Sequence, residues 1–179
     1  MTDTDLELLR YPNGRFEIPA EIGPADRDAF IDRIEATPAH LRQEVEGLDG
    51  AQLDTPYRPE GWSVRQVVHH VVDSHLNSYV RFKWALTEES PRIKVYDQDG
   101  WAQLEDSLSA PVEVSLAFLD ALHARWVFLL RRMSEEDFGR TFGHPDWGKV
   151  RLDQTLAIYA WHGDHHVAHV TALREREGW

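Results

Sequence analysis

Four long segments in which apolar side chains recur every three or four residues constrain the fold of this chain more than any other feature. These segments cover about residues 26–48, 63–90, 112–133 and 152–176 of the 179-residue sequence. Such spacing places the apolar side chains on one face of an α-helix, and amphipathic helices bury these faces against one another. Strand-like alternations are few and there is no internal repeat. The sequence therefore predicts an all-α fold, a four-helix bundle with a roughly up-and-down arrangement.

Proline and glycine residues mark the segments between the predicted helices. Residues 1–23 lack a sustained period and are expected to form an irregular N-terminal arm. Residues 54–61 form a connection, and residues 91–111 form a long loop whose length suggests a lid or a subunit contact. Residues 134–151 have room for a short hairpin. Nothing indicates a second core or a flexible linker, so we expect one domain over residues 1–179.

Three residues indicate how the first two helices begin and continue. Asp26 is a candidate N-cap for the first helix, and Ser63 is a good N-cap for the second. Pro38 lies inside the first predicted helix and should kink or divide it, because proline cannot donate the backbone hydrogen bond that a helix requires.

Charge and composition exclude several classes of protein. The formal net charge of −12, with 19 scattered Lys and Arg residues, would repel nucleic acid and anionic membranes. The chain has no cysteine, which excludes disulfides, thiolate metal ligands and a cysteine nucleophile, so a reacting thiol would have to arrive with a substrate. The acidic N-terminal residues do not resemble a signal peptide, and no apolar run approaches the roughly 20 residues of a membrane span. We therefore expect a cytoplasmic protein.

The last predicted helix contains a cluster of four histidines. His162 and His166 are four residues apart and share the apolar side, whereas His165 lies farther round and His169 lies at its edge. Two imidazoles at this spacing can converge on one ion with bonds of about 2.0–2.1 Å. They could equally be histidines at the margin of the core that hydrogen bonds satisfy. Trp161, which is adjacent, either packs in the core or lines a substrate pocket.

A second histidine motif gives the chain a family resemblance. Trp62-Ser63 begins the second helix, His70 follows Trp62 by eight residues, and His162 and His166 come late in the last helix. In this pattern the chain resembles the DinB-like superfamily and, within it, the YfiT-like group of metal-dependent hydrolases, which is related to bacillithiol S-transferases. The resemblance covers most of the chain, including residues 56–58, 62–87, 159–169 and 174–179. It implies that His70, His162 and His166 are metal ligands and that the protein is a homodimer.

Residues near the first ligand leave alternatives open. Periodicity places His69 nearer the valine-rich stripe of the helix than His70, so His69 could replace it as a ligand. Asp73, one turn after His70, could accept a hydrogen bond from a ligand or orient a water molecule, or it could be a solvated carboxylate. His75 and His123 are expected to fill core or interface positions.

Three neutral imidazoles would leave one divalent ion with an open coordination position, which is typical of catalytic sites. Zinc is the first choice of metal, and nickel is also suited to imidazole. Such a site predicts hydrolysis of a small-molecule substrate by activated water, or alternatively transfer of a small thiol to an electrophile. A third hypothesis is a metal-binding module without turnover. It predicts a further protein ligand, drawn from His69, Asp73, His165 and His169.

Overall fold

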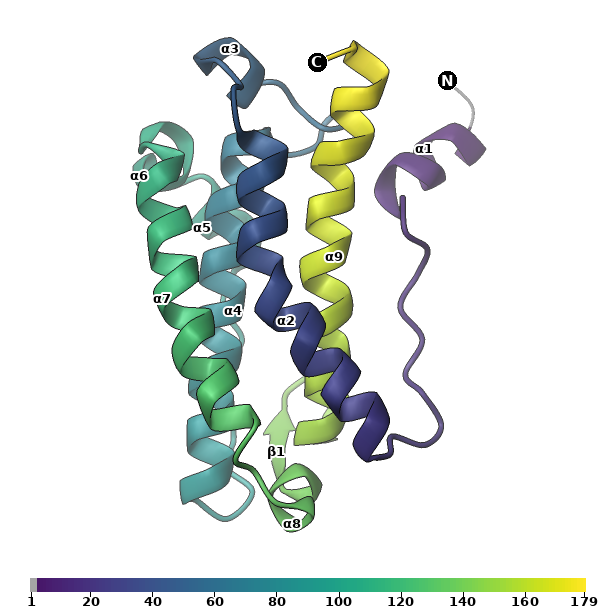
Figure 1. Ribbon diagram of the computed structural model, residues 1–179, viewed down its shortest axis with the longest axis vertical. Helices are drawn as coiled ribbons and strands as arrows, with labels where there is room; N and C mark the ends of the chain where they lie inside the picture. The colour runs from purple at the N-terminus through teal and green to yellow at the C-terminus, as the bar shows by residue number, and fades with distance from the viewer. Residues whose placement is uncertain (1–2) are drawn as a thin grey trace.

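Four long helices form the body of the protein. A computed structural model describes residues 3–179, and in it these helices pack side by side along the long axis of the molecule (Figure 1). They are α2 (Pro24–Val45), α4 (Val64–Thr87), α7 (Val112–Leu130) and α9 (Leu152–Glu177). The predicted all-α fold class, a four-helix bundle, is confirmed.

The four long helices form two parallel pairs. In Figure 1, α2 and α9 run toward one end of the bundle, and α4 and α7 run toward the other. The expected alternation of direction therefore holds from α2 to α4 and from α7 to α9. It is interrupted between α4 and α7, because residues 88–111 return the chain to the end of the bundle at which α4 began.

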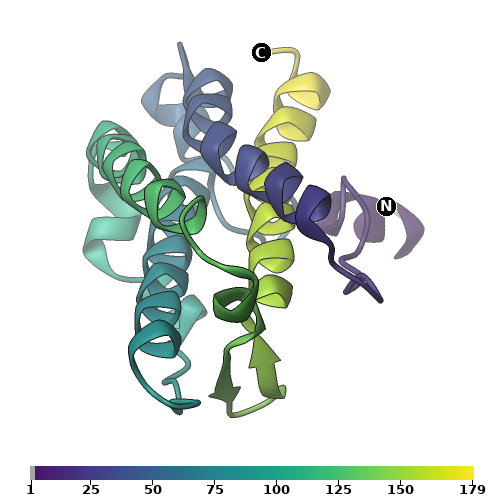
Figure 2. The same cartoon turned by 60° about the horizontal axis from the view of Figure 1, so that its bottom comes forward.

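The N-terminal arm differs from the expectation, because it contains a helix. Residues 3–10 form α1 (Asp3–Arg10), which lies beside α9 in Figures 1 and 2, whereas residues 11–23 contain no helix or strand. The expected arm also included residues 1 and 2, which lie outside the described part of the chain. One helix-end carbonyl of α1 is satisfied from outside, since Arg10 O lies 3.0 Å from Nε2 of His169. A contact this distant in sequence cannot be deduced from local periodicity.

One detail of α2 corrects the sequence interpretation, and another narrows it. Gly23, not Asp26, is the N-cap, and Asp26 instead accepts a 2.9 Å hydrogen bond from the backbone N–H of Gly23. Of the two outcomes expected at Pro38, division does not occur, because the helix is continuous from residue 24 to residue 45, whereas Figure 1 shows that α2 bends partway along its length. In a helix, the backbone N–H of residue 38 would donate to the carbonyl of Ile34, but proline has no N–H. This carbonyl instead accepts a hydrogen bond from Nδ1 of His123 at 2.6 Å.

The connections contain short elements. Residues 91–111, expected to be an irregular loop, contain α5 (Gln98–Ala102) and α6 (Glu105–Ser109). Residues 134–151 contain the hairpin for which the sequence left room, and Figure 2 shows its two strands below α9. The remaining short elements are α3 (Gly50–Leu53), α8 (Glu135–Gly139), β1 (Thr141–His144) and β2 (Gly148–Arg151).

The core has two apolar parts separated by a polar layer. One part surrounds Trp126 and Phe82, and the other contains the valines at the start of α4. Along each long helix the residues between the two parts are more polar, and they include Thr37, Ser74, His75, His123 and His162. The candidate site lies in this histidine-rich layer. We use the term polar layer for these five residues together with His70 and His166.

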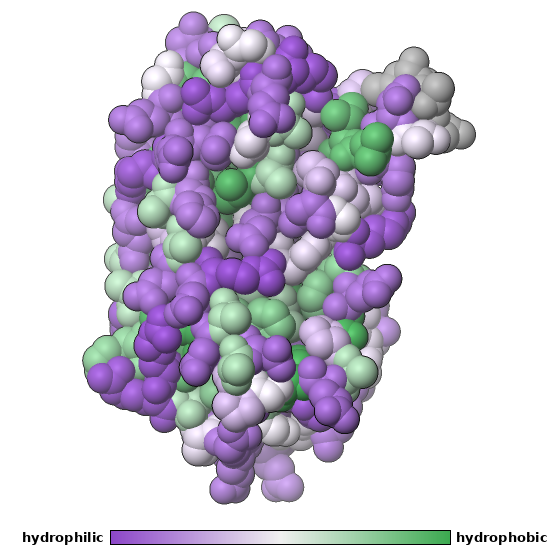
Figure 3. Space-filling view, turned by 45° about the vertical axis from the view of Figure 1, so that its right-hand side comes forward, coloured by the Kyte–Doolittle hydropathy of each residue, from purple (hydrophilic) through white to green (hydrophobic). Residues whose placement is uncertain are grey.

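The face of the molecule shown in Figure 3 is predominantly hydrophilic. Its hydrophobic areas are small and separate, and α1 projects from its upper right. None of the helices in residues 3–179 is both long enough and apolar enough to cross a membrane.

Candidate metal centre

Three histidines from two helices converge in the polar layer. His70 comes from α4, and His162 and His166 come from α9. One ring nitrogen from each lies within 4.8 Å of the others. Nε2 of His70 and Nε2 of His162 are 3.3 Å apart. The structure thus brings together the three side chains that the sequence nominated.

The start of α4 fixes the position of His70. Ser63 caps the helix: its Oγ accepts from the backbone N–H of Gln66 at 3.2 Å, and Oε1 of Gln66 accepts from the backbone N–H of Ser63 at 2.9 Å. Nε2 of Gln66 also donates to the carbonyl of Ala102 at 2.7 Å. Trp62 precedes the cap and packs with its ring centre 4.5 Å from that of His70. His70 therefore lies close to a capped helix end and packs against the indole ring of Trp62.

A close helix contact positions His162 and His166. Gly163 faces α2, where a Cβ atom at position 163 would lie 2.6 Å from Oγ1 and 2.9 Å from Cγ2 of Thr37. Only a residue without a side chain allows α9 to approach α2 this closely. The two histidines on either side of Gly163 are four residues apart, so their rings lie on the same side of the helix.

The three imidazoles are neutral at physiological pH. Burial lowers the pKa of His70 to about 3, and it lowers the pKa of His162 and of His166 well below the ordinary value. Nδ1 of His166 is buried and has no hydrogen-bond partner among the described residues. A buried polar atom without a partner costs about 1–3 kcal/mol. Three neutral imidazoles whose nitrogens converge from two helices fit a divalent ion of the zinc type.

The neighbouring histidines are engaged elsewhere. Nδ1 of His69 lies 2.7 Å from Oγ of Ser115, and its Nε2 lies 3.2 Å from the carbonyl of Ala110. The alternative in which His69 replaces His70 is therefore wrong, because both of its nitrogens bond to the region around the start of α7. Nδ1 of His165 lies 2.9 Å from Oδ1 of Asn13, so this histidine holds the N-terminal arm.

Asp73 is not joined to the three histidines. Its side chain is half-buried, and burial followed by repulsion from Asp106 raises its pKa to about 6. Among residues 3–179, no hydrogen bond or ion pair links its carboxylate to His70, His162 or His166. The suggestion that Asp73 orients a ligand or a water molecule therefore has no contact in the structure to support it.

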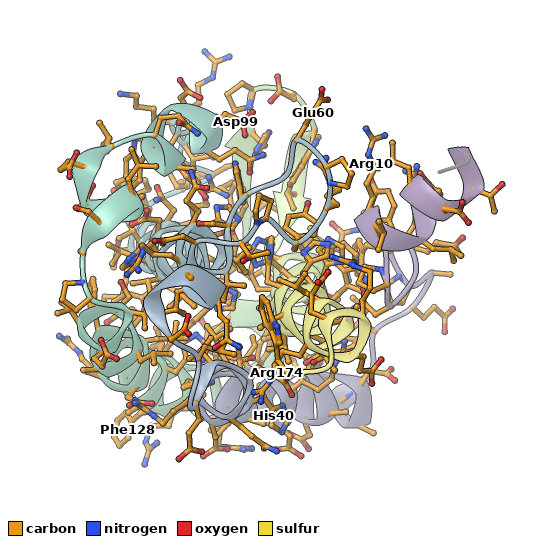
Figure 4. The ribbon with its side chains drawn as sticks, turned by 90° about the horizontal axis from the view of Figure 1, so that it is seen from above. Arg10, His40, Glu60, Asp99, Phe128 and Arg174 are labelled. Atoms are coloured by element: carbon orange, nitrogen blue, oxygen red, sulfur yellow. The ribbon has the colours of Figure 1, made fainter. Side chains whose placement is uncertain are left out.

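A cleft of about 810 Å³ opens onto the three histidines. Trp161 lies in its wall, as one of the two sequence alternatives predicted. Figure 4 shows Arg10, Glu60 and Asp99 along one side of the molecule, and they come from α1, the connection before α4, and α5. The other lining residues are Tyr11, Tyr57, Arg58, Gly61, Trp62, Gln66, His70, Gln98, Gln103, His162, His165, His166 and His169.

Sequence reasoning missed a second set of residues behind the site. Nδ1 of His162 lies 3.1 Å from Nε2 of His75, and Nδ1 of His75 lies 2.8 Å from Nε2 of His123. Oγ of Ser74 lies 3.4 Å from Nε2 of His162. His75 and His123 are buried, as expected of core residues, but they also form a chain of hydrogen bonds that ends at the candidate site. The one sequence feature that pointed to this set was Pro38, because a proline inside a helix leaves the carbonyl four residues before it without its usual donor.

Known proteins resemble this chain in sequence and in fold. The DinB superfamily model matches residues 33–170. A protein of Bacillus cereus named "Putative metal-dependent hydrolase" is 54% identical over 171 residues, which cover 96% of this chain and 98% of that protein. A protein of Bacillus anthracis with the same name is 53% identical, with the same coverage of each chain.

Two solved structures resemble this one. YfiT from Bacillus subtilis, described as a probable metal-dependent hydrolase with an unusual four-helix bundle topology, superimposes with a TM-score of 0.94. It is 48% identical in sequence, and the match covers 96% of this chain and 99% of that one. The four-helix bundle protein TT2238 has a TM-score of 0.58 at 22% identity over 82% of this chain and 98% of its own, a similarity of fold alone. On the extent of the family match and the identity of these relatives, the chain belongs to the DinB superfamily.

Proposed function

We propose that the protein is a metal-dependent hydrolase in which His70, His162 and His166 hold one divalent ion, with zinc as the first choice and nickel as the second. One observation carries the proposal: three neutral imidazoles converge at the inner end of an open cleft. Among residues 3–179, no fourth His, Asp or Glu belongs to this group. A closed structural zinc site would use four protein ligands, whereas a catalytic site keeps one position open.

The protein's own side chains determine the charge of the metal ligands and the access of water to the site. The imidazoles are held neutral by burial, so they present lone pairs and leave the full charge of an ion uncompensated. A divalent ion bound there would supply a Lewis acid that polarises a substrate oxygen and makes water more acidic. Trp62, packed against His70, shields one side of the site from bulk water.

The cleft favours a small-molecule substrate. Its volume of about 810 Å³ is within the usual range for small-ligand sites, roughly 300–1,000 Å³. Both charge signs line it, with Arg10 and Arg58 on one hand and Glu60 and Asp99 on the other. This wall composition favours a polar substrate that carries hydrogen-bonding groups of both kinds.

A turnover assay of zinc-loaded protein tests the proposal. The substrates are an activated aryl ester and an epoxide, each offered with and without a small thiol, and the same assay is repeated with nickel. Product formation without thiol is the expected result, and it should be lost in His166→Ala but retained in His40→Ala, which changes an exposed histidine outside the cleft. Product that forms only with thiol would replace hydrolysis by S-transfer. If no product forms with or without thiol, the remaining hypothesis is a metal-binding module without turnover, and the proposal is contradicted.

A further inference from the structure

Three histidines, of which His75 and His123 are buried and His162 is partly buried, form a continuous chain from a backbone carbonyl of α2 to the candidate metal site. We propose that His75 and His123 are positioning residues that fix His162 in the tautomer with its proton on Nδ1, so that the lone pair of Nε2 faces the site. This inference rests on the proposed metal site, but it concerns the state of the protein before any ion is bound. It assigns a role to two residues that the proposed chemistry does not otherwise use.

The chain begins at Pro38. A residue at this position in a helix would normally donate its N–H to the carbonyl of Ile34, but proline has no N–H. Ile34 is fully buried, so its carbonyl has no access to water and needs another donor. Nδ1 of His123 lies 2.6 Å away. Because a carbonyl oxygen only accepts hydrogen bonds, Nδ1 of His123 must carry the proton.

The direction of each later hydrogen bond follows from the first. A neutral imidazole has one N–H and one lone pair, and burial lowers the pKa of His123 to about 4, so its Nε2 is an acceptor. Nδ1 of His75, 2.8 Å away, must then be the donor. His75 is fully buried and bonds to no carboxylate among the described residues, so a charge on its ring would be uncompensated. The ring is therefore neutral, and its Nε2 is in turn an acceptor. Nδ1 of His162, 3.1 Å from that atom, must therefore donate.

The end of the chain lies in the metal site. With its proton on Nδ1, His162 has a lone pair on Nε2, the nitrogen that lies 3.3 Å from Nε2 of His70. Without the chain, His162 could place its proton on Nε2 and donate it to His70. That tautomer cannot bind an ion through Nε2. A hydrogen bond to the second nitrogen of a ligating histidine both selects the tautomer and holds the ring.

The chain joins all four long helices. It passes from α2 through α7 and α4 to α9, across the polar layer between the two apolar parts of the core. Simple packing of aromatic rings would not require any particular proton position. The rings of His75 and His123 do stack, with centres 4.9 Å apart, so packing and hydrogen-bond direction must be separated by experiment.

Nitrogen NMR of the metal-free protein tests the tautomers directly. In protein labelled with ¹⁵N at histidine, we expect His123, His75 and His162 each to carry the proton on Nδ1 and a lone pair on Nε2. A proton on Nε2 of His162 or of His75 in the wild-type protein would overturn the proposal. This measurement needs no ion and no turnover, so its result is independent of whether the protein is a hydrolase.

A matched pair of variants tests the consequence for metal binding. Glutamine at position 123 offers an amide N–H to Ile34 and an amide oxygen to His75, whereas leucine offers neither. We expect His123→Leu to weaken zinc binding about 10–100-fold, as measured by competition with a chelator, and His123→Gln to restore most of that affinity. Equal zinc dissociation constants in wild type and His123→Leu would overturn the proposal.

Further readouts separate a positioning role from a folding defect. Thermal unfolding of both metal-free variants shows whether they are folded, and the ¹⁵N spectrum of His123→Leu should show the proton of His162 redistributed toward Nε2. If His123→Leu does not fold, His123→Phe keeps a ring in place without any nitrogen and takes its role. Failure of wild type to bind zinc would refute the proposed function, whereas the NMR result would still decide the tautomers.

Discussion

His162 and His166 are one helical turn apart on α9, whereas His70 reaches them from α4. Replacing any one of these three histidines by alanine should lower the zinc bound per chain about tenfold or more, because two imidazoles hold an ion much less tightly than three. Elemental analysis of the purified, zinc-loaded variants measures this. The matched control is His165→Ala, a buried histidine of the same helix whose Nδ1 bonds to Asn13, and it should retain its zinc. Equal zinc in all four variants would contradict the assignment.

Asp73 gives a second prediction at this scale. Burial and the neighbouring Asp106 raise its pKa to about 6, so the folded protein holds a proton there that the unfolded chain has already lost above about pH 4. The stability contributed by this group therefore falls as the pH rises from about 4 to 6. Asp73→Asn should stabilise the protein at pH 8 by about 1–2 kcal/mol, measured by chemical denaturation at pH 4 and pH 8. Zinc content and turnover should stay within a few-fold of wild type, and a large loss of turnover would show that Asp73 serves the reaction.

The candidate ligands could be nominated from the sequence because their spacing is local or is a family feature. Helical spacing alone identified His162 and His166 as a pair. It favoured His69 over His70, and only the resemblance selected His70 correctly as the residue that reaches the pair. The reason is physical: α4 is buried on several sides, so a single apolar stripe does not identify the side that faces α9. The chain through His75 and His123 depends on contacts between four helices, which local spacing does not report.

The close contact of α2 with α9 carries the prediction at the scale of elements. Alanine is a better helix former than glycine, yet Gly163→Ala places a methyl group 2.6 Å from Oγ1 of Thr37. We expect a loss of about 1–3 kcal/mol in the free energy of unfolding, because the two helices must move apart. Denaturant unfolding of the single variant measures the loss. Thr37→Ala removes the atoms that clash, so the double variant should recover much of it, and additive losses would contradict the close-packing explanation.

The four long helices were predictable and the short ones were not. A long amphipathic segment gives several turns of consistent spacing, which is why the ranges of α4, α7 and α9 agree closely with the expectation. α5 and α6 have five residues each, too few to show a period. α1 is held by a bond from His169, about 160 positions away in the sequence. Pro38 remains inside a continuous helix because His123 satisfies the carbonyl that proline leaves free.

At the scale of the whole molecule, the polar layer divides the core and should make folding sensitive to acid. His123 illustrates the sign: its pKa in the folded protein is about 4, below the ordinary value near 6.5. Above pH 6.5 it is neutral in both states. As the pH falls from 6.5 to 4, only the unfolded chain takes up the proton, so stability falls by up to about 1.4 kcal/mol per pH unit for each such histidine.

Denaturant unfolding of the metal-free protein between pH 4 and pH 7.5 checks this expectation. Wild type should lose stability steadily below pH 6.5. His123→Gln cannot take up that proton, so its curve should be shallower by roughly the contribution of one histidine. Parallel curves for the two proteins would show that His123 does not contribute to the acid sensitivity.

The arrangement of the whole chain also limits what sequence alone could establish. The helical fold class followed from periodicity, but the parallel course of α4 and α7 depends on residues 88–111, which return the chain to the end of the bundle at which α4 began. With α7 parallel to α4, His123 of α7 lies behind His75 of α4. The polar layer is thus a property of the topology and not of any one helix.

A crystal structure of the zinc-loaded protein, with anomalous scattering recorded on both sides of the zinc absorption edge, tests the central claim most directly. The account predicts one zinc peak per chain, bonded to one nitrogen each of His70, His162 and His166 at about 2.0–2.1 Å, with a coordination position open to the cleft. A zinc peak elsewhere, or a fourth side chain of the protein closing that position, would contradict it.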